Sequence, residues 1–379
     1  MHRSLIAVVL CCLAPASASA LDRVVLKHDG REVRVSGKLL VTAADGGLLI
    51  LAPDSTLWTV PPEELVTHST DEEPFRPLAG DALADRLLKE LPPGFEVYTT
   101  QHYFICHNTS RAYAQWCGAL FEQLYRGFTN YWSRQGFELE KPQFPLVAVV
   151  FADRESYVKH ATGELGKAAE SIIGYYNLTT NRMTMYDLTG VQSLRRPGDK
   201  RGSLAQINLM LARPESERTV ATVIHEATHQ IAYNCGLQTR LADIPLWVSE
   251  GIAVYFETPD LNSAKGWGNL GAVNPTRLAA FREYTPRRPA DSLRTLVADD
   301  TRFRDTRRAP EAYAEAWALN YYLLHHHPKQ YVAYLQMLSQ KKQLLWDDPA
   351  TRLKEFQDAF GDNLGRLDAD FLRQMQKVR

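Results

Sequence analysis

Short runs of alternating or apolar residues dominate the first part of the chain. Residues 24–27, 32–35 and 48–51 have the length and composition of strands, and turn residues such as Asp29-Gly30 separate them. An Asp-Gly pair between two such runs is typical of a tight hairpin. We therefore predict a small antiparallel β-barrel over residues 21–70, which holds no candidate catalytic group.

The end of this region resembles an SH3-like barrel. Pro61 to Val66 is similar to the closing turn of that barrel, so we expect residues 21–70 to form an SH3-like accessory unit. The next stretch, residues 71–79, is polar and contains two prolines. We predict that it is a linker to the larger part of the chain.

Longer patterns follow the predicted linker. A helix is expected near residues 80–91, strands at 95–99 and 102–107, and a long helix from about Ser110, a suitable N-cap, to Arg134. The continuous apolar run 146–151 predicts a strand that is buried on both faces. The run 182–187 alternates between polar turns, so we expect it to be an edge strand.

Two neighbouring helices carry the candidate chemistry. Apolar residues recur at helical spacing before and after His225-Glu226-Ala227-Thr228-His229, and Gly236 follows as a stop signal. A second helix is expected from Leu246 to about Glu257. Because residues four apart share one face of a helix, His225 and His229 can both bind one metal ion.

The ligand set predicts zinc. With Glu250 from the second helix as third ligand, the site has two imidazoles, one carboxylate and an open position for water, as catalytic zinc requires. Glu226 would stand beside the ion and act as general base.

These residues resemble a known group of enzymes. His225-Glu226-x-x-His229 followed by Glu250-Gly-x-Ala is similar to the gluzincins, the peptidase MA-like zinc metallopeptidases. Within them the chain resembles most a secreted bacterial family of unknown function, DUF1570, over about residues 95–340. The resemblance implies an α+β, thermolysin-like domain over residues 80–260, with a mixed sheet packed on the active-site helix. A helical part, residues 261–379, would complete the cleft.

The resemblance also suggests further site residues. Tyr313 lies in a segment similar to a Tyr-centred helix of these proteins and is a candidate oxyanion donor, although it also fits an ordinary buried stripe. Thermolysin-like enzymes often place an Asp four residues after the ligand Glu, whereas this chain has Val254. Asp243 and Glu257 are the alternatives for orienting a histidine ligand.

The first residues of the chain predict that the protein is located outside the cytoplasm. A basic start, a short apolar run and Ala18-Ser19-Ala20 predict a signal peptide over residues 1–20, cleaved after Ala20, and hence a secreted or periplasmic protein. No later run is long enough for a transmembrane segment.

The formal net charge of −1 gives no reason to expect nucleic acid as a partner. Cys106 and Cys117 could form a disulfide or remain two buried thiols.

Together these patterns predict a secreted zinc metallopeptidase that hydrolyses peptide or amide bonds. A peptide or protein substrate could add to the sheet along the 182–187 edge strand, or that strand could be a plain edge. The alternative is a catalytically inactive, zinc-binding extracytoplasmic scaffold, although such a protein has no use for Glu226. The substrate, the endo- or exopeptidase mode and the oligomeric state are left open by the sequence.

Overall fold

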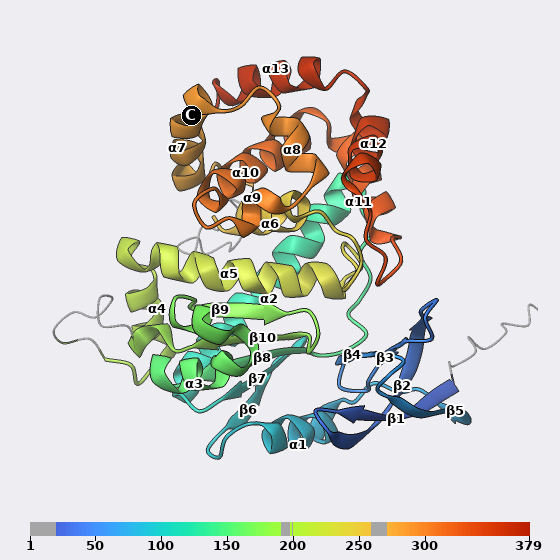
Figure 1. Cartoon of the computed structure of the whole chain (residues 1–379). Coiled ribbons are helices and arrows are strands. Elements are labelled where there is room, and N and C mark those ends of the chain that lie inside the picture. Colours follow the sequence, from blue (N-terminus) through green and yellow to red (C-terminus); the bar gives the residue numbers. More distant parts are fainter. Residues whose placement is uncertain (1–19, 191–197, 199, 259–270) are drawn as a thin grey trace, which may run out of the picture. The chain divides into compact units, whose positions relative to one another are not determined.

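The computed structural model describes residues 20–190, 198, 200–258 and 271–379 of the chain. It divides into two compact units, Met1–Pro77 and Leu78–Arg379, and each unit is described by itself (Figure 1). Apart from Ala20, the predicted signal peptide lies outside the described residues. Among the described helices, none combines the length and apolar character needed to cross a membrane.

The first unit is an antiparallel sheet in the order β4-β3-β2-β1-β5. Asp29 and Gly30, with φ of 49° and 73°, form the predicted two-residue turn between its first two strands. Ala20 pairs with Pro74, so the first residues of the expected linker, 71–74, are strand instead. The strands are β1 (Ala20–His28), β2 (Arg31–Thr42), β3 (Leu48–Leu51), β4 (Leu57–Val60) and β5 (Leu65–Pro74).

The second unit is built on a mixed sheet in the order β6-β7-β8-β10-β9. Its three inner strands are parallel, and the two outer strands run antiparallel to their neighbours. The predicted strand 146–151 lies in the middle and is buried along its whole length, as expected. The strands are β6 (Glu96–Thr99), β7 (Tyr103–His107), β8 (Leu146–Phe151), β9 (Gly174–Asn177) and β10 (Arg182–Tyr186).

The prediction of an edge strand at 182–187 is wrong. β10 pairs with β8 on one side and with β9 on the other, so it has no free edge. The alternation that suggested an exposed face arises because Met183 and Met185 enter the core on one face while Tyr186 is buried on the other. β9 is the edge strand at this end of the sheet.

Helices cover both faces of the sheet. On one face α1 (Gly80–Glu90) and α3 (Arg154–Leu165) pack in one core, and on the other face α2 (Arg111–Gln135) and α5 (Pro214–Asn234) pack in a larger one. The side chain of Ser110 accepts a hydrogen bond from the amide of Tyr113, which confirms the predicted N-cap of α2.

Apart from the short helix at 204–211, which precedes α5, the remaining helices form the C-terminal part of the chain. Figure 1 shows α5 lying between the sheet and this helical part. The helices are α4 (Leu204–Leu211), α6 (Leu246–Phe256), α7 (Pro275–Tyr284), α8 (Ser292–Ala298), α9 (Thr301–Arg304), α10 (Ala309–His326), α11 (Pro328–Ser339), α12 (Pro349–Phe360) and α13 (Leu364–Met375). Short 3₁₀ segments lie at Gly166–Glu170, Leu188–Gly190 and Thr285–Arg287.

All three cysteines in the described part of the chain are free and buried. Cys106 belongs to the core that contains α1 and α3, whereas Cys117 belongs to the core on the α2 face. Since successive side chains of a strand point to opposite faces, Cys106 of β7 cannot approach Cys117 through the sheet. Of the two alternatives for Cys106 and Cys117, a disulfide or two buried thiols, the structure therefore shows the two buried thiols.

Candidate metal centre

α5 is fixed in its rotation by a buried glutamine. It begins with Pro214, which suits a first helical turn, and Gly236, with φ of 78°, follows its end. The Nε2 atom of Gln230 donates hydrogen bonds of 2.9 Å to the carbonyl oxygens of Val147 in β8 and Asn181 beside β10. Because α5 cannot turn without breaking these bonds, the neighbouring His229 keeps a constant direction.

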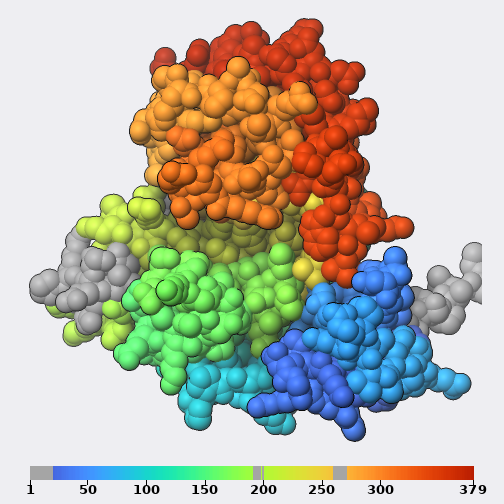
Figure 2. Space-filling model, in the orientation of Figure 1, coloured from blue at the N-terminus to red at the C-terminus, as the bar shows by residue number. Residues whose placement is uncertain are grey.

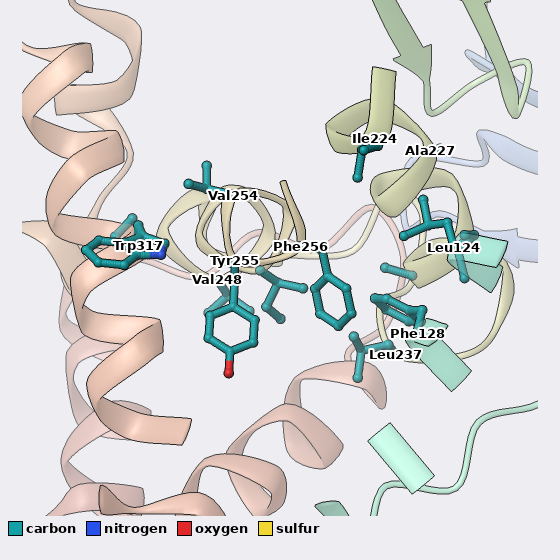
Figure 3. Packing of buried hydrophobic residues seen from close by; sticks show 14 of the residues in the cluster. Leu124, Phe128, Ile224, Ala227, Leu237, Val248, Val254, Tyr255, Phe256 and Trp317 are labelled. Atoms are coloured by element: carbon teal, nitrogen blue, oxygen red, sulfur yellow. The ribbon is translucent and has the colours of Figure 1, made fainter. Parts of the chain in front are cut away.

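α6 lies deep in the core beside α5. Its residues Val248, Val254 and Phe256 point into a cluster that includes Ile224 from α5 and Trp317 from α10 (Figure 3). Their burial leaves little freedom for α6 to shift. Glu250, on the same helix, is only partly exposed and turns towards the histidines of α5.

Gly251 allows α6 and α10 to approach closely. A Cβ atom at this position would lie 1.9 Å from Nδ2 of Asn320 and 2.9 Å from the carbonyl oxygen of Ala316. The same Nδ2 atom donates hydrogen bonds to Trp247 O at 2.9 Å and to Ala316 O at 2.8 Å. The glycine after Glu250 is thus a packing requirement that holds the carboxylate in place.

The structure brings His225, His229 and Glu250 together as one group that could hold a metal ion. The two Nε2 atoms are 3.1 Å apart, and Oε2 of Glu250 lies 3.1 Å and 3.6 Å from those of His225 and His229. Three ligands at about 2.0–2.2 Å from a tetrahedral ion lie about 3.3 Å from one another. The spacing therefore fits an ion of that kind.

Glu257 supplies the partner that the sequence left open. Its Oε1 atom lies 2.8 Å from Nδ1 of His225, on the side of the ring away from Glu250. A proton on Nδ1 leaves Nε2 free to bind a metal. Asp243, the other candidate, is instead buried in an ion pair with Arg352 at 2.9 Å, and Val254 is part of the core.

The charges of the group are strongly coupled. Burial raises the pKa of Glu250, but the two histidines more than offset this and hold it well below its usual range. Burial lowers the pKa of His225, but hydrogen bonds to Glu250 and Glu257 raise it well above its usual value. These directions favour a charged His225 beside a charged Glu250 when no metal is bound, and a cation can replace the proton on Nε2 of His225.

Glu226 points to the sheet edge. Its Oε2 atom accepts a hydrogen bond of 2.8 Å from the backbone amide of Tyr176 in β9. Burial raises the pKa of Glu226, although the neighbouring His225 and His229 oppose this shift. The carboxylate is therefore held at the edge strand, with a proton affinity closer to neutral pH than that of an exposed glutamate.

Tyr313 reaches the same site from α10. Its hydroxyl is hydrogen-bonded to Glu250, and burial, followed by the charge of Glu250, raises its pKa. Its ring packs 5.3 Å from that of Phe303, and the guanidinium of Arg277 lies 5.5 Å from its centre. Arg277 also lies 3.8 Å from Glu257, so it connects two residues of the site.

Two contributors were not predicted from the sequence. One is the backbone amide of Tyr176, which donates to Glu226, and backbone groups leave no trace in composition. Arg277 lies on α7, beyond the predicted motifs. A pattern of apolar and polar positions contains no signal for either.

The surface of the second unit is hollowed over α5. Figure 2 shows this hollow between the green surface around residues 150–190 and the orange surface of the C-terminal helices, with the yellow-green residues of α5 at its floor.

The comparisons with known proteins agree with the position of the motifs. The model of a family described as a protein of unknown function, DUF1570, matches residues 219–345. The matched region includes the three candidate ligands, Glu226 and Tyr313. No curated protein gives a significant match to the chain. What the chain is similar to is therefore a family whose name assigns no function.

Proposed function

We propose that the protein is a secreted, zinc-dependent peptidase of the gluzincin type. The observation that carries this proposal is the position of Glu226 next to a metal-ligand group to which three of the described residues belong. A structural zinc site is usually closed by four ligands, whereas a catalytic one keeps a position open. An acidic group beside such an opening is suited to accept a proton from water.

The residues would divide the chemistry between them. Bound zinc would act as a Lewis acid and would lower the pKa of water in its open position. Glu226 would accept the proton of the attacking water and pass it to the leaving amine. Tyr313 would donate a hydrogen bond to the oxyanion, and Glu257 would hold the proton on Nδ1 of His225.

The fold supports a peptide as substrate. The free edge of β9 lies next to Glu226, and the amide of Tyr176 points away from β10 towards that carboxylate. An extended peptide could add to this edge by backbone hydrogen bonds. The mixed sheet, α5 and the helical C-terminal part support our assignment of a thermolysin-like domain, and we propose that the first unit is an SH3-like accessory barrel.

Metal analysis and peptide profiling test the proposal together. Protein purified with zinc should contain about one ion per chain, and an unbiased peptide library should show cleavage. Glu226→Gln should keep the zinc and lose the cleavage. Glu217→Gln, an exposed change on the same helix, is the matched control and should retain both.

Zinc binding without cleavage of any peptide by the unaltered protein would favour the inactive scaffold instead. Equal cleavage by the Glu226→Gln variant and the unaltered protein would remove the proposed base.

A further inference from the structure

Arg240 lies next to the end of β9. It lies in the loop between α5 and α6, the two helices that carry the candidate ligands. Its Nη1 atom donates hydrogen bonds to the carbonyl oxygens of Leu178 at 3.1 Å and Thr179 at 3.4 Å. These two residues follow directly after the last residue of β9, Asn177.

Arg240 differs from three other buried or half-buried arginines of this unit. Arg288, Arg302 and Arg352 each contact a carboxylate at 2.5–2.7 Å. Within the part of the chain that the structure describes, Arg240 forms no ion pair, and Nη1 alone of its guanidinium nitrogens has a hydrogen-bond acceptor. The side chain is half-buried, and this burial lowers the pKa of Arg240, a shift that Tyr176 opposes.

The residue is connected to the reacting groups through Tyr176. The charge of Arg240 acts on the hydroxyl of Tyr176, whose backbone amide binds Glu226. The ring of Tyr176 stacks on Tyr233, one helical turn after His229, with centroids 5.9 Å apart. A peptide along the edge of β9, rising about 3.3 Å per residue, would reach Arg240 about two or three residues from Glu226.

Residues 343 and 344 hold the backbone around Arg240 in place. Nε2 of Gln343 donates to the carbonyl oxygen of Arg240 at 2.8 Å, and the amide of Leu344 donates to that of Leu241 at 2.7 Å. Ala242 and Gln343 also form a β-bridge. The guanidinium is thus presented on a fixed loop, as a recognition group should be.

We propose that Arg240 determines specificity by binding a carboxylate of the substrate at this end of β9. An arginine offers a planar fork of donors that matches a carboxylate, and such a contact becomes stronger where water is partly excluded. The carboxylate could belong to an acidic side chain or to the free C-terminus of a peptide. This proposal rests on the proposed peptidase function and names the substrate class of the same site.

Matched peptide pairs test the proposal on the zinc-loaded full chain. In the first kind of pair, one peptide has Glu and the other has Gln at the same position, and each position around the cleaved bond is tested in turn. In the second kind of pair, one peptide ends in a free carboxylate and the other in an amide. The unaltered protein should prefer the carboxylate member of one pair by about 10- to 100-fold in kcat/KM. The pair that shows the preference identifies the source of the carboxylate.

Variants separate recognition from a structural role. Arg240→Gln should abolish the preference and leave kcat/KM for the neutral peptide nearly unchanged, while Arg240→Lys should keep part of the preference. Arg126→Gln, an exposed change on α2, is the control and should behave as the unaltered protein. An equal loss for the charged and neutral peptides would overturn the proposal, because Arg240 would then only support the end of β9.

Binding to the Glu226→Gln variant gives a readout that does not need turnover. Fluorescence anisotropy should show tighter binding of the carboxylate peptide, and Arg240→Gln in the same background should remove the difference. If the unaltered protein cleaves nothing but this binding difference remains, the peptidase function fails and the role of Arg240 stands. If cleavage occurs without any preference for a carboxylate, the role of Arg240 fails alone.

Discussion

Nδ1 of His225 and Oε1 of Glu257 lie 2.8 Å apart. The imidazole of His225 therefore contacts two carboxylates, because its Nε2 atom faces Glu250. The contact with Glu257 fixes both the ring and the position of its proton. Asn274 Nδ2, 3.5 Å from the other oxygen of Glu257, and Arg277 support the carboxylate from α7. Glu257 therefore acts on the metal centre without being a ligand.

Replacing Glu257 should weaken metal binding without removing it. Glu257→Gln keeps the shape of the side chain but loses its charge, so Nε2 of His225 becomes a poorer ligand. We expect zinc affinity to fall about 10- to 100-fold, as is usual for the partner of a histidine ligand. Competition with a chelating dye measures this change. Glu283→Gln, which is exposed on α7, is the control, and an unchanged affinity for Glu257→Gln would contradict the assigned role.

The raised pKa of His225 predicts proton release when metal binds. Hydrogen bonds to Glu250 and Glu257 keep His225 protonated above its usual range, and that proton must leave before Nε2 can bind an ion. Metal affinity should therefore fall as pH falls, by roughly tenfold per unit for each proton displaced. Because the pKa is raised, the dependence should persist above pH 6.5, the usual value for histidine.

Calorimetry in two buffers with different ionisation enthalpies measures the number of protons released at pH 7. The Glu257→Gln variant should release fewer, since it lacks one of the two hydrogen bonds that raise the pKa. Equal proton release by the two proteins would show that Glu257 does not control the proton on His225.

Gly251 should tolerate no side chain. Alanine at this position would overlap Nδ2 of Asn320, so α6 and α10 would have to separate or the Asn320 side chain would lose its bonds. Overpacking of this kind costs about 1–3 kcal/mol, and the displaced Glu250 should also bind metal less well. Urea denaturation and zinc titration measure the two effects.

Gly163 provides the matched comparison for that change. It is also a helical glycine, in α3, but a Cβ atom there would meet nothing within 4 Å. Gly163→Ala should therefore leave the free energy of unfolding unchanged or raise it by about 0.4–1 kcal/mol. A similar loss of stability in both variants would contradict the role of the contact with Asn320, because Gly163 has no such contact.

The sequence predicted those parts of the site that depend on local spacing. His225, Glu226 and His229 share one helix, and Glu250 follows a turn after Pro245, so their positions depend on helical period and chain order. The edge strand was assigned wrongly because alternation reports burial within a strand and says nothing of which strands lie beside it. β9 takes the edge because the chain turns back at Asn181, whose φ is 60°, to place β10 beside β8.

Contacts between distant elements could not be predicted in the same way. Glu257 was one of two acidic candidates, and only the packing of α6 on α5 distinguishes it from Asp243, which pairs with Arg352 from a helix far along the chain. Nothing in the sequence signals that Arg240 forms no ion pair with the residues that the structure describes. Such facts depend on tertiary structure, which brings together charges that are unrelated in sequence.

A substitution of Tyr313 distinguishes a role of this residue in packing from a role in catalysis. Phenylalanine at this position keeps the ring against Phe303 and Arg277 but removes the hydroxyl that contacts Glu250. If the hydroxyl stabilises the oxyanion, Tyr313→Phe should keep zinc and substrate KM while kcat falls about 100- to 1,000-fold. Burial keeps the phenol protonated over the neutral range, so the loss should not depend on pH there.

Steady-state kinetics on the best peptide substrate, with metal content measured in the same samples, checks this expectation. Tyr321→Phe is the control, because Tyr321 lies on the same helix and its ring stacks on His325. A Tyr313→Phe variant with unchanged kcat would assign Tyr313 to the apolar stripe of α10 alone. A variant with normal kcat per bound zinc but reduced zinc content would instead show that the hydroxyl serves to orient Glu250.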